Sequence, residues 1–386
     1  MSKRFVVKLN KCSNVNKSMS KLNPPEHPDH YWMAQALAEA KTALYRTRPN
    51  PAVGCVIVKD DQIIGRGATA PVGGSHAEVF ALREAGDRAE GATAYVTLEP
   101  CAHFGRTPPC AEALVRAKVA RVVIATLDPN PLVAGKGQKI LNNAGITTQV
   151  GVLEQDAIEL NRGFLKVMAG GLPYVRLKVA SSLDGRTAMA SGESKWITGV
   201  DARLDVQYWR ARSAVVITGI QTVLADDCQL NVRVLADVED ISAIVQPKRL
   251  VLDRQGRLPL TAKILHAPES LMVMVMGPFR QELADLGVLQ LPVQSLRELL
   301  ATLSKEYHLY DVMVEAGTTL ATAFLQEKLV DEMISYIAPT LLGQSARAMF
   351  SADLHKMSEQ LRFKLFDVTQ IGQDIRLRLI PIQETV

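Results

Sequence analysis

The chain has 386 residues, of which 47% are hydrophobic and 22% are charged, and its formal net charge is +4. This length is too great for one ordinary hydrophobic core and predicts two domains. No run of eighteen or more apolar residues occurs, which argues against a membrane-spanning helix.

The excess of positive charge is confined to the N-terminus. Residues 1–23 contain six Lys or Arg and no acid, so the rest of the chain has 38 basic against 40 acidic residues. A nucleic-acid-binding surface needs clustered Lys and Arg on the folded domain, and this distribution argues against one. We expect residues 1–27 to form a disordered basic tail; the alternative is an artefact of start assignment, with Met19 as the start. The five cysteines, odd in number and unevenly spaced, fit a reducing cytoplasm rather than a disulfide framework.

Helical and strand patterns alternate between residues 28 and 172. Apolar residues spaced by three and four predict an amphipathic helix over 28–46, and "AVGCVIVKDDQIIGRG" predicts two strands around an Asp-Asp turn. The alternation predicts a largely parallel sheet covered on both faces. The other expected elements are a helix over 76–92, a strand over 93–100, a helix over 108–120, a strand over 121–130 and a helix over 137–146.

The pattern breaks at Gly170, Gly171 and Pro173, which places a domain boundary near residue 172. A second α/β domain is predicted beyond it. Its expected elements are strands starting at 174, 214, 249, 271 and 310, and helices over 201–213 and 319–330.

A His-x-Glu pair, His76 and Glu78, precedes two cysteines in a proline-rich loop, Cys101 and Cys110. Catalytic zinc sites use three protein ligands of this kind and keep one position for water. His76, Cys101 and Cys110 would supply the ligands, and Glu78 would transfer a proton. The pattern is typical of zinc nucleobase deaminases, although eight residues rather than two separate the cysteines.

Two other interpretations stay open. His103, inside the loop, would close the site if this were a non-catalytic zinc module. The same pattern also occurs in nucleic-acid-editing deaminases, against which the near-neutral body of the chain argues.

A nicotinamide site is less evident. "GRGATA" at 65–70 closes a hairpin rather than opening a helix, so it fails as a dinucleotide-binding fingerprint. In "YDVMVEAGTTLATAFL" a strand is followed by Glu315, Gly317 and a helix whose first turn holds Thr318 and Thr319. Free backbone N–H groups and hydroxyls there would suit a phosphate.

Five motifs occur in one order, namely "PNPAVGCVIV", "HAE", "TLEPCAHFGRTPPC", "DPNPLVAGKG" and "SLDGRTAMASGESKWITG". Together they resemble the bifunctional deaminase–reductases of bacterial riboflavin biosynthesis, over about residues 30–380. The resemblance implies a cytidine-deaminase-like three-layer α/β/α domain over 28–172 and a dihydrofolate-reductase-like α/β domain over 173–386. It implies one zinc ion per chain and NADPH as cofactors.

The implied substrate is 2,5-diamino-6-(5-phosphoribosylamino)pyrimidin-4-one, which is hydrolytically deaminated before its ribosyl side chain is reduced to ribityl. The resemblance assigns zinc to His76, Cys101 and Cys110, and proton transfer to Glu78. The implied deaminase substrate contacts are Asn50, Arg106, Asp128 and Asn130. The implied reductase substrate contacts are Lys178, Ser194, Thr198, Arg210, Leu230, Arg233 and Glu315. The implied NADPH contacts are Ala180, Trp196, Thr222, Asp226, Gly317, Thr318, Thr319, Leu320, Ala321, Thr322 and Ala323.

Some of these residues have simpler explanations. "PNP" and "DPNP" make good turns whatever they bind, Arg210 would also suit a solvated helix face, and Trp196 would suit a core. With Arg233, Arg210 is the candidate phosphate clamp. Lys178 and Asp226 are candidates for polarising or protonating the reacting group.

The chain departs from the family pattern at three positions, Ala102, Cys228 and Arg254, where serine, proline and a small hydroxyl residue are usual. The last two put the reductase loop and the cofactor preference in doubt. We expect a cytoplasmic homo-oligomer that acts on a small molecule, without a nucleic-acid or membrane partner.

Overall fold

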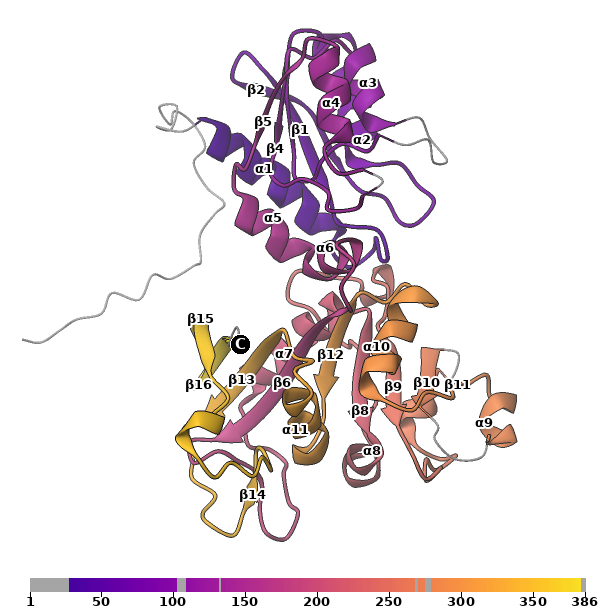
Figure 1. Cartoon of the computed structure of the whole chain (residues 1–386), viewed down its shortest axis with the longest axis vertical. Helices are drawn as coiled ribbons and strands as arrows, with labels where there is room; N and C mark the ends of the chain where they lie inside the picture. The colour runs from indigo at the N-terminus through magenta and orange to yellow at the C-terminus, as the bar shows by residue number, and fades with distance from the viewer. Residues whose placement is uncertain (1–27, 103–108, 132, 268–269, 275–278, 383–386) are drawn as a thin grey trace, which may run out of the picture.

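The computed structural model describes residues 28–102, 109–131, 133–267, 270–274 and 279–382. The predicted tail, 1–27, lies outside these residues. The described chain contains a five-stranded sheet, a nine-stranded sheet and a small two-stranded one. Figure 1 shows the first two in separate bodies, joined through helix α6. No helix in the described ranges is long and apolar enough to cross a membrane.

The first sheet has the strand order β2-β1-β3-β4-β5. Its strands are β1 (Gly54–Lys59), β2 (Gln62–Ala68), β3 (Thr93–Val96), β4 (Arg121–Ile124) and β5 (Thr147–Val150). The predicted hairpin is β1-β2, and its Asp-Asp turn has φ values of 50° and 54°, which aspartate tolerates. The sheet is mixed rather than largely parallel, because β1 is antiparallel to both of its neighbours; only β3, β4 and β5 run parallel.

Helices cover both faces of this sheet, as predicted. Alternate side chains of β1 point to opposite faces, so Val56 packs with α1 and α5 while Ile57 packs with α2, α3 and α4. The first helix ends at Ala43, three residues before the predicted end. The helices are α1 (Pro28–Ala43), α2 (Ala77–Ala85), α3 (Cys110–Arg116), α4 (Lys136–Asn143), α5 (Glu154–Leu160) and α6 (Arg162–Met168).

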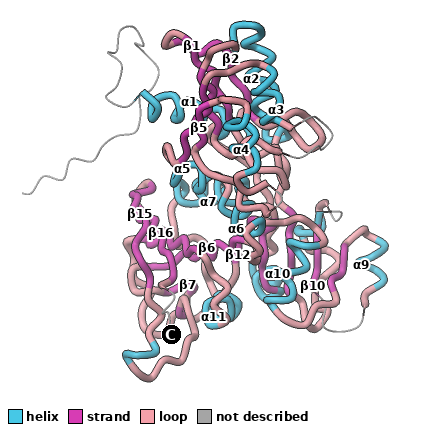
Figure 2. Tube along the Cα trace, turned by 45° about the horizontal axis from the view of Figure 1, so that its top comes forward, coloured by secondary structure: helices cyan, strands magenta, loops and turns pink. Residues whose placement is uncertain are grey.

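The second sheet has the order β11-β10-β9-β8-β12-β6-β13-β16-β15 and is parallel from β11 to β13. An antiparallel hairpin, β15-β16, forms one end, with β10 toward the other (Figure 2). Its strands are β6 (Tyr174–Ser182), β8 (Val215–Gly219), β9 (Lys248–Leu252), β10 (Leu271–Met274), β11 (Leu289–Leu291), β12 (Asp311–Glu315), β13 (Glu332–Ala338), β15 (Phe363–Ile371) and β16 (Asp374–Pro381). The small sheet pairs β7 (Arg186–Ala188) with β14 (Arg347–Ala348).

This sheet also has two apolar faces. One packs against α7 and α8, with Trp209 among its largest buried side chains, and the other packs against α10 and α11. The helices are α7 (Val200–Arg212), α8 (Ile220–Asp226), α9 (Gln281–Asp285), α10 (Leu296–Lys305) and α11 (Thr318–Gln326).

Charged side chains join the two bodies. Glu159, at the end of α5, accepts hydrogen bonds from Arg212 and Arg378 of the second body at 3.3 and 2.8 Å. Gly163 in α6 packs so closely on Asp311 that a Cβ there would lie 2.4 Å from the carboxylate. Only glycine fits this approach between α6 and β12.

Candidate functional site

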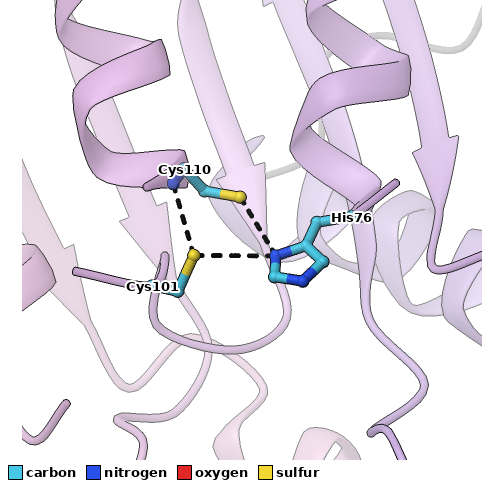
Figure 3. Close-up of side chains that lie close together, drawn as sticks. All are labelled: His76, Cys101 and Cys110. Carbon is cyan, nitrogen blue, oxygen red and sulfur yellow. Dashed lines mark hydrogen bonds between the residues drawn. The ribbon is translucent and has the colours of Figure 1, made fainter. Parts of the chain in front are cut away.

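Three metal-ligating side chains meet where two helices begin (Figure 3). His76 is the N-cap residue of α2, Cys110 is the first residue of α3, and Cys101 lies in the loop after β3. His76 Nδ1 lies 3.3 Å from the Cys110 sulfur and 3.6 Å from the Cys101 sulfur. The fold thus brings together the three residues predicted to bind zinc.

The spacing of these atoms fits zinc. Tetrahedral coordination at the usual Zn–S and Zn–N lengths places sulfur and nitrogen ligands roughly 3.6 Å apart. A hydrogen bond from Cys110 lowers the pKa of Cys101, and the pKa of Cys110 itself is raised. Among the described residues, the His, Cys, Asp and Glu side chains close enough to share a metal here are these three, the number of protein ligands that catalytic zinc sites use. The alternative ligand His103 lies outside the described residues.

Glu78 lies in the first turn of α2, two residues after the histidine, and is 4% exposed. Burial raises the pKa of its carboxyl to about 7. A group with this pKa can both accept and release a proton near neutral pH, which is what a proton shuttle requires.

Glu99 is a buried carboxylate that the sequence analysis did not include. It accepts hydrogen bonds from the backbone N–H groups of Asp128, Gly135 and Gln138 at 3.3, 3.0 and 3.2 Å. Because Glu99 lies two residues before Cys101, these hydrogen bonds join the loop that carries Cys101 to the segment that follows β4. The sequence feature that could have indicated Glu99 is an acidic residue in "TLEP", directly after an otherwise apolar strand.

The predicted deaminase substrate contacts come from loops at one edge of the sheet. Because β1 is antiparallel to β3, the loop before β1, with Asn50, lies at the same edge as the loops after β3 and β4. Asp128 is buried, and its Oδ1 accepts the backbone N–H of Asn130 at 2.9 Å, so the turn interpretation also holds there. Arg106 lies outside the described residues.

A charged cluster lies at the centre of the second sheet. Arg210 of α7 donates to both carboxylate oxygens of Glu315, at 2.5 and 3.0 Å, and Lys178 Nζ lies 3.8 Å from the same carboxylate. Burial lowers the pKa of Lys178. The predicted phosphate-binding arginine is therefore not on a solvated face; it is paired with another predicted substrate contact.

Other predicted reductase residues surround this cluster. Asp226 and Arg233 lie close enough to interact electrostatically with its members. Arg233 is exposed, whereas Leu230 is buried in a left-handed conformation with φ 56°. Cys228, which replaces the usual proline, also interacts with Glu315, and burial raises the pKa of its thiol to about 11.

The predicted cofactor turn starts helix α11, with Gly317 as its N-cap. The hydroxyls of Thr318 and Thr322 donate to the carbonyls of Ala348 and Thr318, at 2.6 and 2.8 Å. Ala321 is buried. The first-turn backbone N–H groups, including those of Thr319 and Leu320, have no partner within the helix and so suit a phosphate. Ala323 lies in the next turn of the same helix.

The segment 194–199 carries Ser194, Trp196 and Thr198. The Trp196 side chain is 70% exposed, which excludes the core interpretation. Arg203 lies over its ring at 4.4 Å and donates to the Thr198 carbonyl at 2.6 Å. Two further predicted cofactor contacts, Ala180 on β6 and Thr222 on α8, are partly buried.

Comparison with known proteins matches both bodies. Residues 26–126 match the cytidine and deoxycytidylate deaminase zinc-binding region, and residues 173–377 match the RibD C-terminal domain. The riboflavin biosynthesis protein RibD of Escherichia coli is 47% identical over 91% of this chain and 99% of its own length. The Acinetobacter baumannii RibD structure is 70% identical, with a TM-score of 0.88, over 92% of this chain and 99% of that one.

A Thermotoga maritima structure, described as a diaminohydroxyphosphoribosylaminopyrimidine deaminase/5-amino-6-(5-phosphoribosylamino)uracil reductase, is 32% identical with a TM-score of 0.82. It covers 92% of this chain and 99% of its own. A zinc-binding deaminase domain followed by a reductase domain defines a bifunctional deaminase–reductase. The chain belongs to the RibD family of riboflavin biosynthesis proteins. Its cofactors are zinc and NADPH, as predicted.

Proposed function

We propose that the protein converts 2,5-diamino-6-(5-phosphoribosylamino)pyrimidin-4-one in two steps, hydrolytic deamination in the first body and reduction of the ribosyl side chain in the second. The observation on which this rests most directly is the zinc-compatible group His76, Cys101 and Cys110, with the buried carboxyl of Glu78 beside it. The name of the Thermotoga maritima relative supports the substrate.

In the deamination, His76, Cys101 and Cys110 would hold zinc, which would make hydroxide available near neutral pH. Glu78 takes up the proton released as the nucleophile forms and delivers it to the departing amino group. Its raised pKa supports this role, because the group then changes protonation state easily at pH 7. Asn50, Asp128 and Asn130 orient the pyrimidine, and Arg106 contacts the substrate phosphate.

In the reduction, NADPH supplies the hydride. We assign substrate contacts to Lys178, Arg210 and Glu315, whose charges are held together in a buried cluster. Ser194, Thr198, Leu230 and Arg233 complete that set. The depressed pKa of Lys178 supports a role in giving a proton to the reacting group.

We assign NADPH to the carboxyl ends of the central strands of the same sheet. Its proposed contacts are Ala180, Trp196, Thr222, Asp226 and residues 317–323. The exposed Trp196 ring and the N-terminus of α11 support this placement.

We place the domain boundary at residues 172 and 173, between the end of α6 and the start of β6. We also place the protein in the cytoplasm, which is supported by the lack of a disulfide among the four described cysteines, Cys55, Cys101, Cys110 and Cys228. Exposed apolar side chains on the edge strand β15, including Phe366 and Val368, support a homo-oligomer. The near-neutral balance of the chain beyond its tail supports a protein without a nucleic-acid partner.

A coupled assay on the purified full chain tests the proposal. With the diaminopyrimidinone substrate and NADPH, ammonia release should be followed by loss of NADPH absorbance. Ammonia release without NADPH consumption would contradict the reductase assignment, with Cys228 and Arg254 as the first positions to revert. If the zinc-loaded protein shows neither ammonia release nor loss of NADPH absorbance, that result would contradict the proposed substrate.

A further inference from the structure

The loop that carries Asn50 is held by the second body as well as by its own. It connects α1 to β1 and covers residues 44–53. On one side, Asn161 holds it in place, since its side chain accepts the backbone N–H of Ala52 at 2.8 Å and donates to the Ala52 carbonyl at 2.9 Å. On the other side, the loop contacts residues of the reductase body.

Tyr45 forms the apolar part of this contact. Its ring packs in a cluster with Ala211, Val232 and Leu235 of the reductase body. Its carbonyl accepts the backbone N–H of Val245 at 2.9 Å. The start of the loop is therefore packed into the neighbouring body rather than exposed.

Arg48 forms the polar part. Its Nη1 donates to the carbonyl of Ala211 and its Nη2 donates to the carbonyl of Val245. Ala211 lies in the last turn of α7, where carbonyls lack partners within the helix and the helix dipole favours a cation. Burial lowers the pKa of Arg48 to about 10, which leaves it charged at neutral pH.

Two features connect the contact of Arg48 with the reductase body to the proposed substrate-binding residues of both bodies. Asn50 is only two residues from Arg48, and its backbone N–H donates to the carbonyl of Thr47 at 2.9 Å, so one turn carries both residues. On the other side, Ala211 directly follows Arg210, which binds Glu315 in the reductase cluster. A pocket between the bodies is lined by residues of both, Asn50 and Arg212 among them.

We propose that Arg48 is a positioning residue for the deamination, through which the reductase body fixes the place of Asn50. The inference rests on the proposed contact of Asn50 with the substrate. A guanidinium that bonds two carbonyls of the second body restricts the turn that presents Asn50, so less ordering remains to be done when the substrate binds.

The test uses the full zinc-loaded chain and four variants, with KM and kcat measured separately for ammonia release from the diaminopyrimidinone. Arg48→Ala should raise the deaminase KM roughly fivefold or more while zinc content and kcat stay close to wild type. Arg48→Lys should restore part of the affinity, since an ammonium can still donate to a carbonyl. Arg46→Ala is the matched control, because the exposed Arg46 donates to the carbonyl of Thr42 in its own body, with no side-chain bond to the reductase body among the described residues, and should leave KM unchanged.

Asn50→Ala separates this inference from the proposed function. If Asn50→Ala raises the deaminase KM and Arg48→Ala does not, the positioning role is overturned and the substrate contact stands. If Asn50→Ala leaves KM unchanged, the substrate contact itself fails, and the positioning role fails with it. An equal effect of Arg46→Ala and Arg48→Ala, or a loss of zinc in Arg48→Lys, would also overturn the proposal.

Discussion

Replacement of Arg210 by alanine tests the charged cluster of the reductase body. The change leaves Glu315, which is 9% exposed, with Lys178 at 3.8 Å as its nearest cation. Burial alone would raise the pKa of Glu315, and Arg210 is the main group that instead keeps it low. Breaking a buried ion pair from one side costs about 3–5 kcal/mol, and the remaining lysine favours the lower end.

A loss of about 3 kcal/mol in a domain of this size corresponds to a fall in Tm of about 6–12 °C. Calorimetry of the full chain measures that fall, and the coupled assay should show a raised reductase KM with ammonia release unchanged. Arg116→Ala is the control, because Arg116 pairs with Glu112 on an exposed helix face and contributes less than about 0.5 kcal/mol.

The double variant Arg210→Ala/Glu315→Gln distinguishes the cause. It removes the stranded charge, so it should recover much of the stability lost in the single variant. A double variant as unstable as Arg210→Ala would refute the view that an unpaired buried carboxylate is responsible. Loss of ammonia release in Arg210→Ala would instead indicate a defect that extends beyond the reductase body.

Three further predictions follow from the first body and the junction. Glu78→Gln should keep zinc and reductase activity but lower ammonia release by roughly 10²–10⁴-fold, and retained deamination would remove the proton shuttle. Glu99→Gln leaves backbone donors unsatisfied, so it should destabilise the deaminase by about 1–3 kcal/mol and raise its KM, whereas the exposed Glu90→Gln should do neither. Although burial raises the pKa of Glu159, three arginines lower it to about 2, so the stability it contributes should be present above pH 4.5 and lost on acidification toward pH 2. Thermal unfolding between these pH values should show a smaller acid dependence for Glu159→Gln.

The zinc site could be predicted from sequence because its determinants are local. A histidine that starts a helix fixes the direction of Glu78 two residues later, and a strand followed by a proline loop returns Cys110 to Cys101. Asn50 is different. Its surroundings depend on Arg48 and on residues about 160 to 200 positions away, and no spacing in the sequence indicates that contact.

Three of the elements that the sequence did not predict, β16, α5 and α6, have a physical explanation as well. Strand β16 has arginines at alternate positions, Arg376 and Arg378, a pattern that indicates an exposed segment. In the structure Arg378 points inward to the buried carboxylate of Glu332. Helices α5 and α6 were not predicted for a similar reason. Glu159 of α5 and Arg162 of α6 lie where the two bodies meet, and they form an ion pair at 2.7 Å instead of an apolar contact. Patterns of apolar residues do not reveal helices and strands whose inner faces are joined by ion pairs.

Deamination must come before reduction if the two bodies act on the metabolite in turn, and zinc depletion tests that order. The zinc-depleted full chain should consume no NADPH with the diaminopyrimidinone substrate, yet consume it at the normal rate when given the deaminated uracil intermediate. Returning zinc should restore NADPH consumption with the first substrate, after ammonia appears. NADPH consumption by the zinc-depleted protein with the diaminopyrimidinone would contradict the account.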